Sequence, residues 1–269
     1  MKKINKIIIN EMIVMYNDGI SARQISKTLG LHVDSVTRHL KSNGIKIKSN
    51  IKYSINEDFF KTIDNEKNAY WLGFLMADGY VAQIRKKKMD KKGTSLHSRL
   101  VVLLQNEDHN HLEKMLKDMS STHLVKLRKR IVNEKEFLYS SVEIYNKKIT
   151  SDLISLGCVQ KKSLILSYPD IPASMHRHFI RGYFDGDGTV YITAKGRKEA
   201  KFCSASKQFM ESIKEILSNY GIETGSISKG DRVWILGVRA KSLQNYFDFI
   251  YNDSKTYLDR KYVKSLQIF

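Results

Sequence analysis

Two stretches of the chain, Tyr70-Trp-Leu-Gly-Phe-Leu-Met-Ala-Asp-Gly-Tyr80 and Phe179-Ile-Arg-Gly-Tyr-Phe-Asp-Gly-Asp-Gly-Thr189, follow one template. Each is an apolar helical run with two small residues four positions apart, followed by Asp-Gly. The small pairs are Gly73 with Ala77 and Gly182 with Gly186. Because positions four apart share one helix face, small residues there let two helix backbones approach closely. If the two helices pack through these faces, Asp78 and Asp187 arrive side by side.

Both stretches resemble the motif of the LAGLIDADG homing endonucleases, in the monomeric form that carries two copies. Trp71–Gly79 and Ile180–Gly188 align with the motif at every structural position. Met76 stands in place of the motif's first acid, which Asp185 retains. The resemblance implies that the later acid of each copy, which both copies keep, binds metal.

The composition indicates a polyanionic partner. The 269 residues carry a formal net charge of +18, and such an excess favours a polyanion through phosphate contacts. The resemblance implies that this polyanion is double-stranded DNA. No uninterrupted apolar run approaches the roughly 18 residues of a membrane-spanning helix, and the N-terminus lacks a signal-peptide core. Cys158 and Cys203, the only cysteines, are too few for a zinc site and predict reduced thiols. We therefore expect a protein of the cytoplasm or host nucleoid, with no membrane contact.

The apolar patterns predict an α+β protein with an internal repeat. From residue 68 onward the order α-β-β-α-β-β-α occurs twice, including strands at 224–229 and 232–239 and a helix at 241–251. Pro169 and Pro172 interrupt the chain between the two halves. We predict a helix-turn-helix domain at 1–48, a linker at 49–67 whose second half leads into the first motif helix, and repeats at 68–168 and 169–269. In the resembling family such repeats form a pseudo-symmetric saddle over DNA, so a monomer is expected.

Residues 5–43 read as three short helices. Ile25, Leu29, Leu31, Val36 and Leu40 have the spacing of a helix-turn-helix core, with Gly30 in the turn. The segment resembles the DNA-binding helix-turn-helix of recombinases and phage regulators. That resemblance implies that the third helix presents Ser35, Thr37, Arg38 and Lys41 to the major groove. The alternative is an ordinary small helical bundle.

Alternating polar and apolar residues predict strands with one face on helices and the other toward DNA. Val125, Leu127 and Ile131 are expected to face helices, as are Leu138, Val142 and Ile144. The candidate DNA contacts are Gln83, Arg85, Lys126, Arg128, Arg130, Tyr139, Ser141, Tyr191, Thr193, Lys195 and Arg232. The basic run 85–92 is expected to clamp the DNA backbone. A solvated sheet face and a solvated loop would show the same patterns.

The two aspartates match metal-assisted attack on a phosphodiester. Magnesium prefers oxygen ligands and keeps several waters, so Asp78 and Asp187 with the carbonyls of Ala77 and Gly186 suffice as protein ligands. We expect Mn²⁺ to substitute for Mg²⁺ and Ca²⁺ to bind without supporting fast cleavage. Gln105, Lys147 and Lys241 resemble the family's solvent-ordering and charge-stabilising positions. The resemblance further implies one aspartate per strand cut, across a narrowed minor groove, with short 3′ overhangs.

The function expected from these features is a site-specific homing endonuclease that makes a double-strand break in a long asymmetric DNA target. Its gene is expected in a mobile element or phage, and an intein is not expected. Two alternatives use the same scaffold: an RNA-splicing maturase and a non-catalytic DNA-binding regulator. The added helix-turn-helix argues against the maturase, and the intact pair of acids argues against the regulator.

Overall fold

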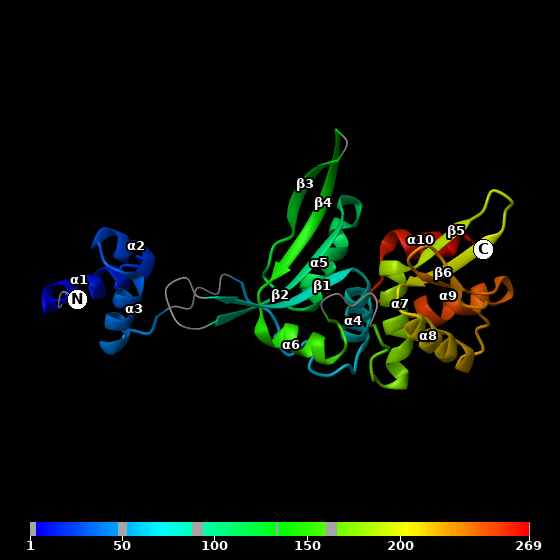
Figure 1. The fold of residues 1–269 in the computed structure, drawn as a ribbon, viewed down its shortest axis with the longest axis horizontal. Helices are drawn as coiled ribbons and strands as arrows, with labels where there is room; N and C mark the ends of the chain where they lie inside the picture. The colour runs from blue at the N-terminus through cyan, green and yellow to red at the C-terminus, as the bar shows by residue number, and fades with distance from the viewer. Residues whose placement is uncertain (1–3, 48–52, 88–93, 133, 160–165, 269) are drawn as a thin grey trace. The chain divides into compact units, whose positions relative to one another are not determined.

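The structure is a computed structural model that describes residues 4–47, 53–87, 94–132, 134–159 and 166–268. The chain divides into two compact units, Met1–Lys52 and Tyr53–Phe269. Figure 1 shows the helices and strands of each unit. Within the described ranges, the helices are too short or too polar to cross a membrane.

The smaller unit contains three helices around a four-residue core. They are α1 (Lys6–Asn17), α2 (Ala22–Thr28) and α3 (Val33–Ser42). Ser21 begins α2 with a capping box, in which its side chain accepts from the Gln24 amide. The core is Met12, Ile25, Val36 and Leu40, with Leu29 and Leu31 packed against it. The predicted helices and inward residues are therefore present, while their action as a DNA-reading helix-turn-helix stays a prediction.

The predicted linker over residues 49–67 is shorter in the structure. Phe59, Phe60 and Ile63 are buried in the core of the larger unit, with at most 8% of each residue exposed. The Ser54 amide donates to the Thr122 hydroxyl at 2.8 Å, which ties this segment to the first repeat. Apolar residues too widely spaced for a regular helix or strand still bury well as a packed irregular segment. The linker prediction was wrong for this part of the chain.

The larger unit shows the predicted repeat. Its first half consists of α4 (Glu66–Asp78), β1 (Gly79–Lys87), β2 (Thr94–Gln105), α5 (His109–Asp118), β3 (Lys126–Val132), β4 (Lys135–Ile144) and α6 (Lys147–Ser155). Its second half consists of α7 (His176–Asp187), β5 (Thr189–Ile192), β6 (Lys198–Ser204), α8 (Lys207–Asn219), β7 (Ser228–Lys229), β8 (Trp234–Gly237) and α9 (Leu243–Tyr251). A closing helix, α10 (Asp259–Gln267), follows. The α+β fold with two αββαββα repeats is confirmed.

Each half has its own four-stranded antiparallel sheet. The strand orders are β1-β2-β4-β3 and β5-β6-β8-β7, so the two sheets share one topology. Figure 1 shows α4 and α7 at the centre of the unit, between the sheets. One hydrophobic core runs through both halves and includes Trp71, Phe74, Phe179 and Phe184. The motif helices are therefore the structural junction of the repeat.

Three predicted elements differ in extent or surroundings. In the strand predicted at 224–229, only Ser228–Lys229 form β7, and Thr224 makes an isolated bridge with Val238. The helix predicted at 241–251 begins as a 3₁₀ turn at Ala240–Ser242. The apolar face predicted for β3 does not pack on helices: Leu127 is 63% and Ile131 72% exposed. β3 is an edge strand, and its hairpin with β4 extends away from the helices of its half (Figure 1).

Candidate active site

Helices α4 and α7 cross through their glycines. A Cβ atom built on Gly73 would overlap the carbonyl oxygen of Phe179 and lie 2.9 Å from the amide nitrogen of Tyr183. A Cβ on Gly182 would overlap the carbonyl oxygen of Tyr70 in the same way. Since Cβ atoms do not approach backbone atoms this closely, the backbone contact requires glycine at both positions. The close helix approach predicted from the small-residue spacing is thus the geometry of the structure.

The crossing brings the ends of the two helices together. One turn after each glycine, Ala77 and Gly186 face each other, and a Cβ on Gly186 would overlap the Cβ of Ala77. The same added atom would lie 3.4 Å from Oδ2 of Asp78, so the Asp78 carboxylate reaches the end of α7. Asp78 and Asp187, the last residues of α4 and α7, are both exposed. Two accessible carboxylates therefore occupy the point where the repeats meet.

A cleft opens beside Asp187. Its volume is about 320 Å³, and both halves of the unit line it. The end of α4 contributes Met76 and Ala77, while the second half contributes Tyr183, Asp187, Cys203 and Arg232. The cleft places a carboxylate, a phenol and a guanidinium on one concave surface.

Lys261 of α10 is a buried cation behind this carboxylate pair. Its Nζ donates to the carbonyl oxygens of Phe184 at 2.7 Å, Gly186 at 3.1 Å and Gly188 at 2.5 Å. Burial lowers the pKa of Lys261 to about 8, against the opposing attraction of Asp185, Asp78 and Asp187. The lysine therefore satisfies carbonyls at the C-terminal end of α7 and adds positive charge near both acids.

Lys261 was missed in the sequence analysis. Only Lys261 and Ser265 of α10 are buried within the described residues, and Leu258 before it is also buried. The signal in the sequence was a lysine on the buried face of the amphipathic helix α10, where a charged residue needs a partner. Its partner could not be read from the sequence, because the contacts join residues more than 70 positions apart.

The first acid of the second motif is structural. Asp185 is 1% exposed and accepts from the Tyr70 hydroxyl at 2.8 Å, the Tyr251 hydroxyl at 2.7 Å and the Leu258 amide at 2.7 Å. Burial raises the pKa of Asp185, and these hydrogen bonds oppose the rise. Asp185 thus joins α4, α9 and the segment before α10, and is turned away from solvent.

The donor set at the helix ends fits a divalent cation with oxygen ligands. Asp78 and Asp187 supply carboxylates, and the described residues contain no cluster of three or more His, Cys, Asp and Glu that would form a closed cage. Magnesium keeps several waters and needs few protein ligands, so two carboxylates suit it. Of the predicted carbonyl ligands, Ala77 stays a prediction, whereas the Gly186 oxygen already accepts from Lys261. A carbonyl that faces an ammonium is a poor ligand for a second cation.

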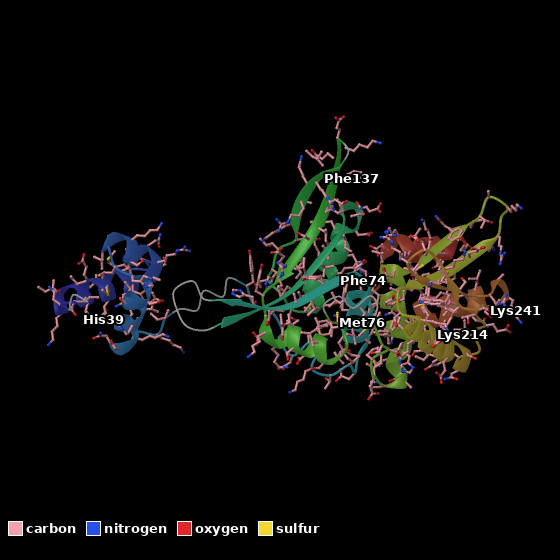
Figure 2. All side chains as sticks on the ribbon, in the orientation of Figure 1. His39, Phe74, Met76, Phe137, Lys214 and Lys241 are labelled. Atoms are coloured by element: carbon pink, nitrogen blue, oxygen red, sulfur yellow. The ribbon has the colours of Figure 1, made fainter. Side chains whose placement is uncertain are left out.

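The other predicted solvent-ordering residues are dispersed. Gln105 is exposed at the end of β2, opposite Tyr139 of β4. Lys147 is exposed at the start of α6. The Lys241 ammonium pairs with Glu223 at 2.6 Å, and Figure 2 shows it at the outer end of the second half, away from Met76 at the cleft. The prediction that placed Lys241 near the acids was wrong. It rested on aligning the two repeats, and that alignment does not show that Lys241 pairs with Glu223 on the surface.

The first sheet presents a basic face opposite its buried one. Lys126 lies opposite Ser141, Arg128 opposite Tyr139 and Arg130 opposite Phe137, so these side chains share one face. Val142 and Ile144 of β4 are buried on the other face. Leu103 and Gln105 of β2 lie opposite Ser141 and Tyr139 and share this face. We call the face that carries Lys126, Arg128, Arg130, Leu103 and Gln105 the open face of the first sheet. The predicted contacts Lys126, Arg128, Arg130 and Tyr139 therefore lie together on it.

Two predicted contacts of this sheet, Ser141 and Gln83, are placed differently, and the side chain of Arg85 lies outside the described residues. Ser141 is 3% exposed, and its hydroxyl lies 3.2 Å from Nε of Arg128, so it holds the arginine instead of facing outward. Gln83 is in register with Ser98, on the strand face that buries Val81. An offset of one residue moves a side chain to the opposite face of a strand, so Gln83 does not lie on the open face. Most of the predicted clamp at 85–92 lies outside the described residues.

In the second sheet, only Tyr191 of the predicted strand contacts lies on a strand. Its hydroxyl donates to Glu199 at 2.6 Å and accepts from Lys201 at 2.7 Å. Thr193 and Lys195 lie beyond the end of β5 in a turn, where the Thr193 hydroxyl accepts from the Arg197 amide. Arg232 is exposed before β8 and lines the cleft.

In the smaller unit, Arg38 and Lys41 are exposed on α3, whereas Ser35 and Thr37 are half-buried. The Thr37 hydroxyl donates to the Val33 carbonyl one turn earlier, at 2.5 Å. α3 therefore presents two cations to solvent, and their role in DNA reading stays a prediction.

Residues 174–251 match the family model of the LAGLIDADG-like domain. This part of the chain is a LAGLIDADG-like domain. The match covers the second motif helix and the strands and helices that follow it, and the first half repeats their order and sheet topology. The resemblance drawn from the two motif copies is thereby confirmed.

A solved homing endonuclease has a similar fold. The homing endonuclease I-WcaI bound to its DNA recognition sequence superimposes with a TM-score of 0.54 at 14% identity, over 82% of this chain and 97% of that chain. I-DmoI in complex with DNA and Mn gives a TM-score of 0.46 at 17% identity, over 70% of this chain and 97% of that chain.

Two curated relatives are much longer proteins. The ATP-dependent DNA helicase Hel308 of Methanocaldococcus jannaschii is 24% identical over 227 residues, which is 79% of this chain and 17% of the helicase. Elongation factor 2 of Methanopyrus kandleri is 34% identical over 79 residues, which is 29% of this chain and 6% of the factor. This chain thus spans a small part of either relative.

Proposed function

We propose that this protein is a metal-dependent, site-specific DNA endonuclease of the homing type. The observation that carries the proposal is the pair of exposed carboxylates, Asp78 and Asp187, at the adjoining ends of two crossing helices. Each helix leads directly into the first strand of its own sheet. Asp78 and Asp187 thus lie between the two sheets. This arrangement suits a DNA duplex that both sheets bind and that is cut between them.

The charge of the surface supports DNA as the substrate. The formal net charge is +18, and the open face of the first sheet carries Lys126, Arg128 and Arg130. Phosphate contacts by such cations release counterions and give salt-dependent affinity. The relatives with the same fold include I-WcaI, which was solved bound to its DNA recognition sequence.

Asp78 and Asp187 would hold the divalent cation, with the Ala77 carbonyl as a further oxygen ligand. When bound, Mg²⁺ or Mn²⁺ activates water and stabilises the leaving oxygen of the phosphodiester, whereas Ca²⁺ would bind without fast cleavage. Lys261 adds a fixed positive charge near both carboxylates, which limits their mutual repulsion. Each aspartate would serve one strand, and the cuts would leave short 3′ overhangs.

The two halves favour a long asymmetric target read by a monomer. Corresponding strands carry different side chains, for example Leu103 in the first sheet and Cys203 in the second, so the half-sites need not match. The N-terminal unit would add DNA contacts through Arg38 and Lys41 of α3. A cytoplasmic or nucleoid location in the host is part of the proposal.

The test is cleavage of a library of double-stranded DNA sites in Mg²⁺, with wild type, Asp78→Asn and Asp187→Asn. Cutting at one asymmetric site, lost as a double-strand break in each variant, is expected. Asp248→Asn is the matched control, since Asp248 lies exposed on α9 and accepts from Gln244. Metal-independent binding without cutting would replace the proposal with a DNA-binding regulator, and a preference for structured RNA would replace it with a maturase.

A further inference from the structure

The two motif acids have different neighbours in the sequence. Asp187 lies between Gly186 and Gly188, whereas Asp78 lies between Ala77 and Gly79. Glycine has the widest choice of backbone conformations, so the peptide groups around Asp187 are less restricted by their own residues than those around Asp78. The end of α7 is therefore a place where a contact from outside the helix can decide the direction of the acid.

Lys261 of α10 supplies such a contact. Its Nζ donates to the carbonyl oxygens of Gly186 at 3.1 Å and Gly188 at 2.5 Å, the residues on either side of Asp187. It also donates to the Phe184 carbonyl at 2.7 Å, which accepts the Gly188 amide at the end of the helix. An ammonium group has three protons, and these carbonyls account for all of them. Lys261 therefore has no proton left for a carboxylate or a phosphate, and it acts through the backbone of α7.

The end of α4 has a different donor at the corresponding position. Leu75 lies three residues before Asp78, as Phe184 lies three residues before Asp187. The Leu75 carbonyl accepts from the Cys158 thiol at 3.5 Å. A thiol is a weak donor, whereas an ammonium group is a charged one. The corresponding carbonyls of the two motif helices are thus bound with different strength.

Contacts of the neighbouring residues set the place of Lys261. The Leu258 amide donates to Oδ2 of Asp185 at 2.7 Å, which fastens the start of α10 to α7. Nε of Arg260 donates to Oδ1 of Asp108 at 2.9 Å, and Asp108 belongs to the first half of the unit. Lys261 itself is 5% exposed. Since α10 follows both αββαββα repeats, the lysine reaches the end of α7 from a segment outside the repeat.

We propose that Lys261 is a positioning residue for Asp187, and that the two strand cuts of this endonuclease depend on it unequally. The ammonium group holds the peptide groups on both sides of Asp187, so that the carboxylate keeps one direction at the end of α7. This inference rests on the proposed function and adds to it that α10 is needed for the cut that Asp187 serves.

The first measurement follows each strand separately on a target duplex whose strands carry different labels. Asp78→Asn and Asp187→Asn identify the strand that each acid serves. Lys261→Met keeps the length of the side chain and removes its donors. It is expected to slow the cut assigned to Asp187 about tenfold or more, because a small displacement of a catalytic group is costly, while the other cut stays within about threefold. Equal slowing of both cuts, or no slowing of either, would overturn the inference.

Lys264→Met is the matched control. Lys264 is exposed on α10, three residues after Lys261, and the substitution removes the same charge from the same helix. Both cuts should keep their wild-type rates in this variant. Slowing of the Asp187 cut equal to that in Lys261→Met would assign the effect to the overall charge of α10 and would refute the positioning role.

The second measurement separates position from charge and needs no cleavage. Ca²⁺ is titrated by calorimetry into the protein on its uncut target, in an Asp78→Asn background that keeps Asp187 and in the reciprocal Asp187→Asn background. Loss of a positive charge alone would tighten Ca²⁺ binding in both backgrounds, because like charges repel. If Lys261 positions Asp187, Lys261→Met should instead weaken Ca²⁺ binding in the background that keeps Asp187 and should not weaken it in the other. Tighter or unchanged binding where Asp187 remains, or equal weakening in both backgrounds, would refute the positioning role.

Lys261→Arg carries the test if Lys261→Met does not fold. Arginine retains the buried charge, but its longer, planar guanidinium does not place three protons around the position of Nζ. The cut assigned to Asp187 should again be slowed more than the other cut. Circular dichroism at the assay temperature checks that the variant is folded. A wild-type ratio of the two cuts in folded Lys261→Arg would overturn the inference.

The two proposals fail in distinguishable ways. If wild type cuts DNA and the folded Lys261 variants cut both strands at wild-type rates, the positioning role is wrong and the endonuclease stands. If wild type neither cuts DNA nor binds Ca²⁺ at the aspartates, the endonuclease proposal is wrong and the role of Lys261 falls with it.

Discussion

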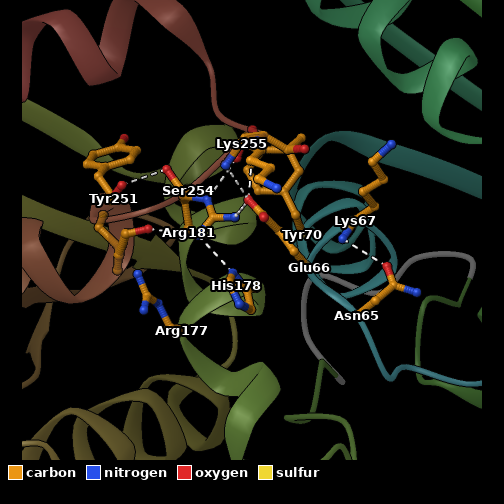
Figure 3. Close-up of polar contacts among 12 residues, drawn as sticks. Asn65, Glu66, Lys67, Tyr70, Arg177, His178, Arg181, Tyr251, Ser254 and Lys255 are labelled. Atoms are coloured by element: carbon orange, nitrogen blue, oxygen red, sulfur yellow. Dashed lines mark hydrogen bonds and ion pairs between the residues drawn. The ribbon is translucent and has the colours of Figure 1, made fainter.

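Arg181 of α7 donates through Nη2 to Oε1 of Glu66 in α4 at 2.7 Å, and this ion pair joins the two halves away from the acids. Figure 3 shows the guanidinium between Glu66 and His178. Nε of Arg181 donates to the Thr256 carbonyl and Nη1 to the Ile250 carbonyl, both at 2.8 Å. The arginine is 0% exposed, and burial lowers its pKa. A buried charge with its donors satisfied in this way holds the crossing helices and the C-terminal segment together.

Loss of this arginine should destabilise the larger unit strongly. Arg181→Met keeps a similar volume but removes the cation that pairs with Glu66, which then keeps only the amides of Lys255 and Thr256 as donors. It also removes the donor to two buried carbonyls, and we expect a loss of about 3–5 kcal/mol in the free energy of unfolding. Urea denaturation followed by circular dichroism measures it. Lys207→Met removes an exposed ion pair with Glu211 and should cost less than about 1 kcal/mol. A similar small loss for both variants would contradict the structural role of Arg181.

A methyl group at the helix crossing should separate the helices. In Gly73→Ala the added Cβ meets the Phe179 carbonyl, and we expect a loss of about 1–3 kcal/mol or more, because the two backbones cannot move apart without disturbing the core. Thermal unfolding is the measurement. In the control Gly225→Ala, the nearest atom to the added Cβ is 3.7 Å away, an ordinary contact. Equal melting temperatures for Gly73→Ala and wild type would show that the crossing tolerates side chains.

His111 should make stability fall with decreasing pH. Burial lowers the pKa of His111 to about 3, from an ordinary value of 6.5. The unfolded chain therefore binds a proton below pH 6.5 that the folded protein does not, so this contribution is full above pH 6.5 and is lost as the pH falls toward 3. Between pH 7.5 and pH 5 the loss is about 2 kcal/mol. Urea denaturation at the two pH values should show a loss about 2 kcal/mol larger in wild type than in His111→Gln, because the variant keeps the contribution of His178, whose pKa burial lowers to about 4. An equal pH effect in both proteins would assign the loss to other groups.

DNA affinity should depend on salt through the open face of the first sheet. If Arg128 and Arg130 each neutralise a phosphate, Arg128→Gln and Arg130→Gln should each reduce the slope of log affinity against log salt by about 1. Fluorescence anisotropy with a labelled target duplex at several KCl concentrations measures this slope. Lys229→Gln, on the short strand β7 of the other sheet, reports whether both sheets contribute. An unchanged slope for both arginine variants would place the DNA on another surface.

The repeat could be read from local residues. Small residues four apart, an Asp-Gly ending and regular apolar spacing depend on neighbours within one helix or strand, and these predicted both motif helices, most strands and the helices of the smaller unit. Strand faces were predicted less well. Leu127 and Ile131 alternate as buried residues would, yet they are exposed because β3 is an edge strand that extends beyond the helices.

The sequence by itself determined the helix crossing and the two acids, since glycine spacing and the Asp-Gly ends are properties of each helix alone. Only the tertiary structure decided what surrounds the acids. Lys261 reaches Gly188 across 73 positions, and Tyr183 meets the Cys203 carbonyl across 20. Such contacts depend on the tertiary fold, because a buried polar atom forms a hydrogen bond with a polar group that the fold places beside it. Alignment of the two repeats does not include contacts between distant residues. It therefore predicted Lys241 near the acids and did not predict Lys261.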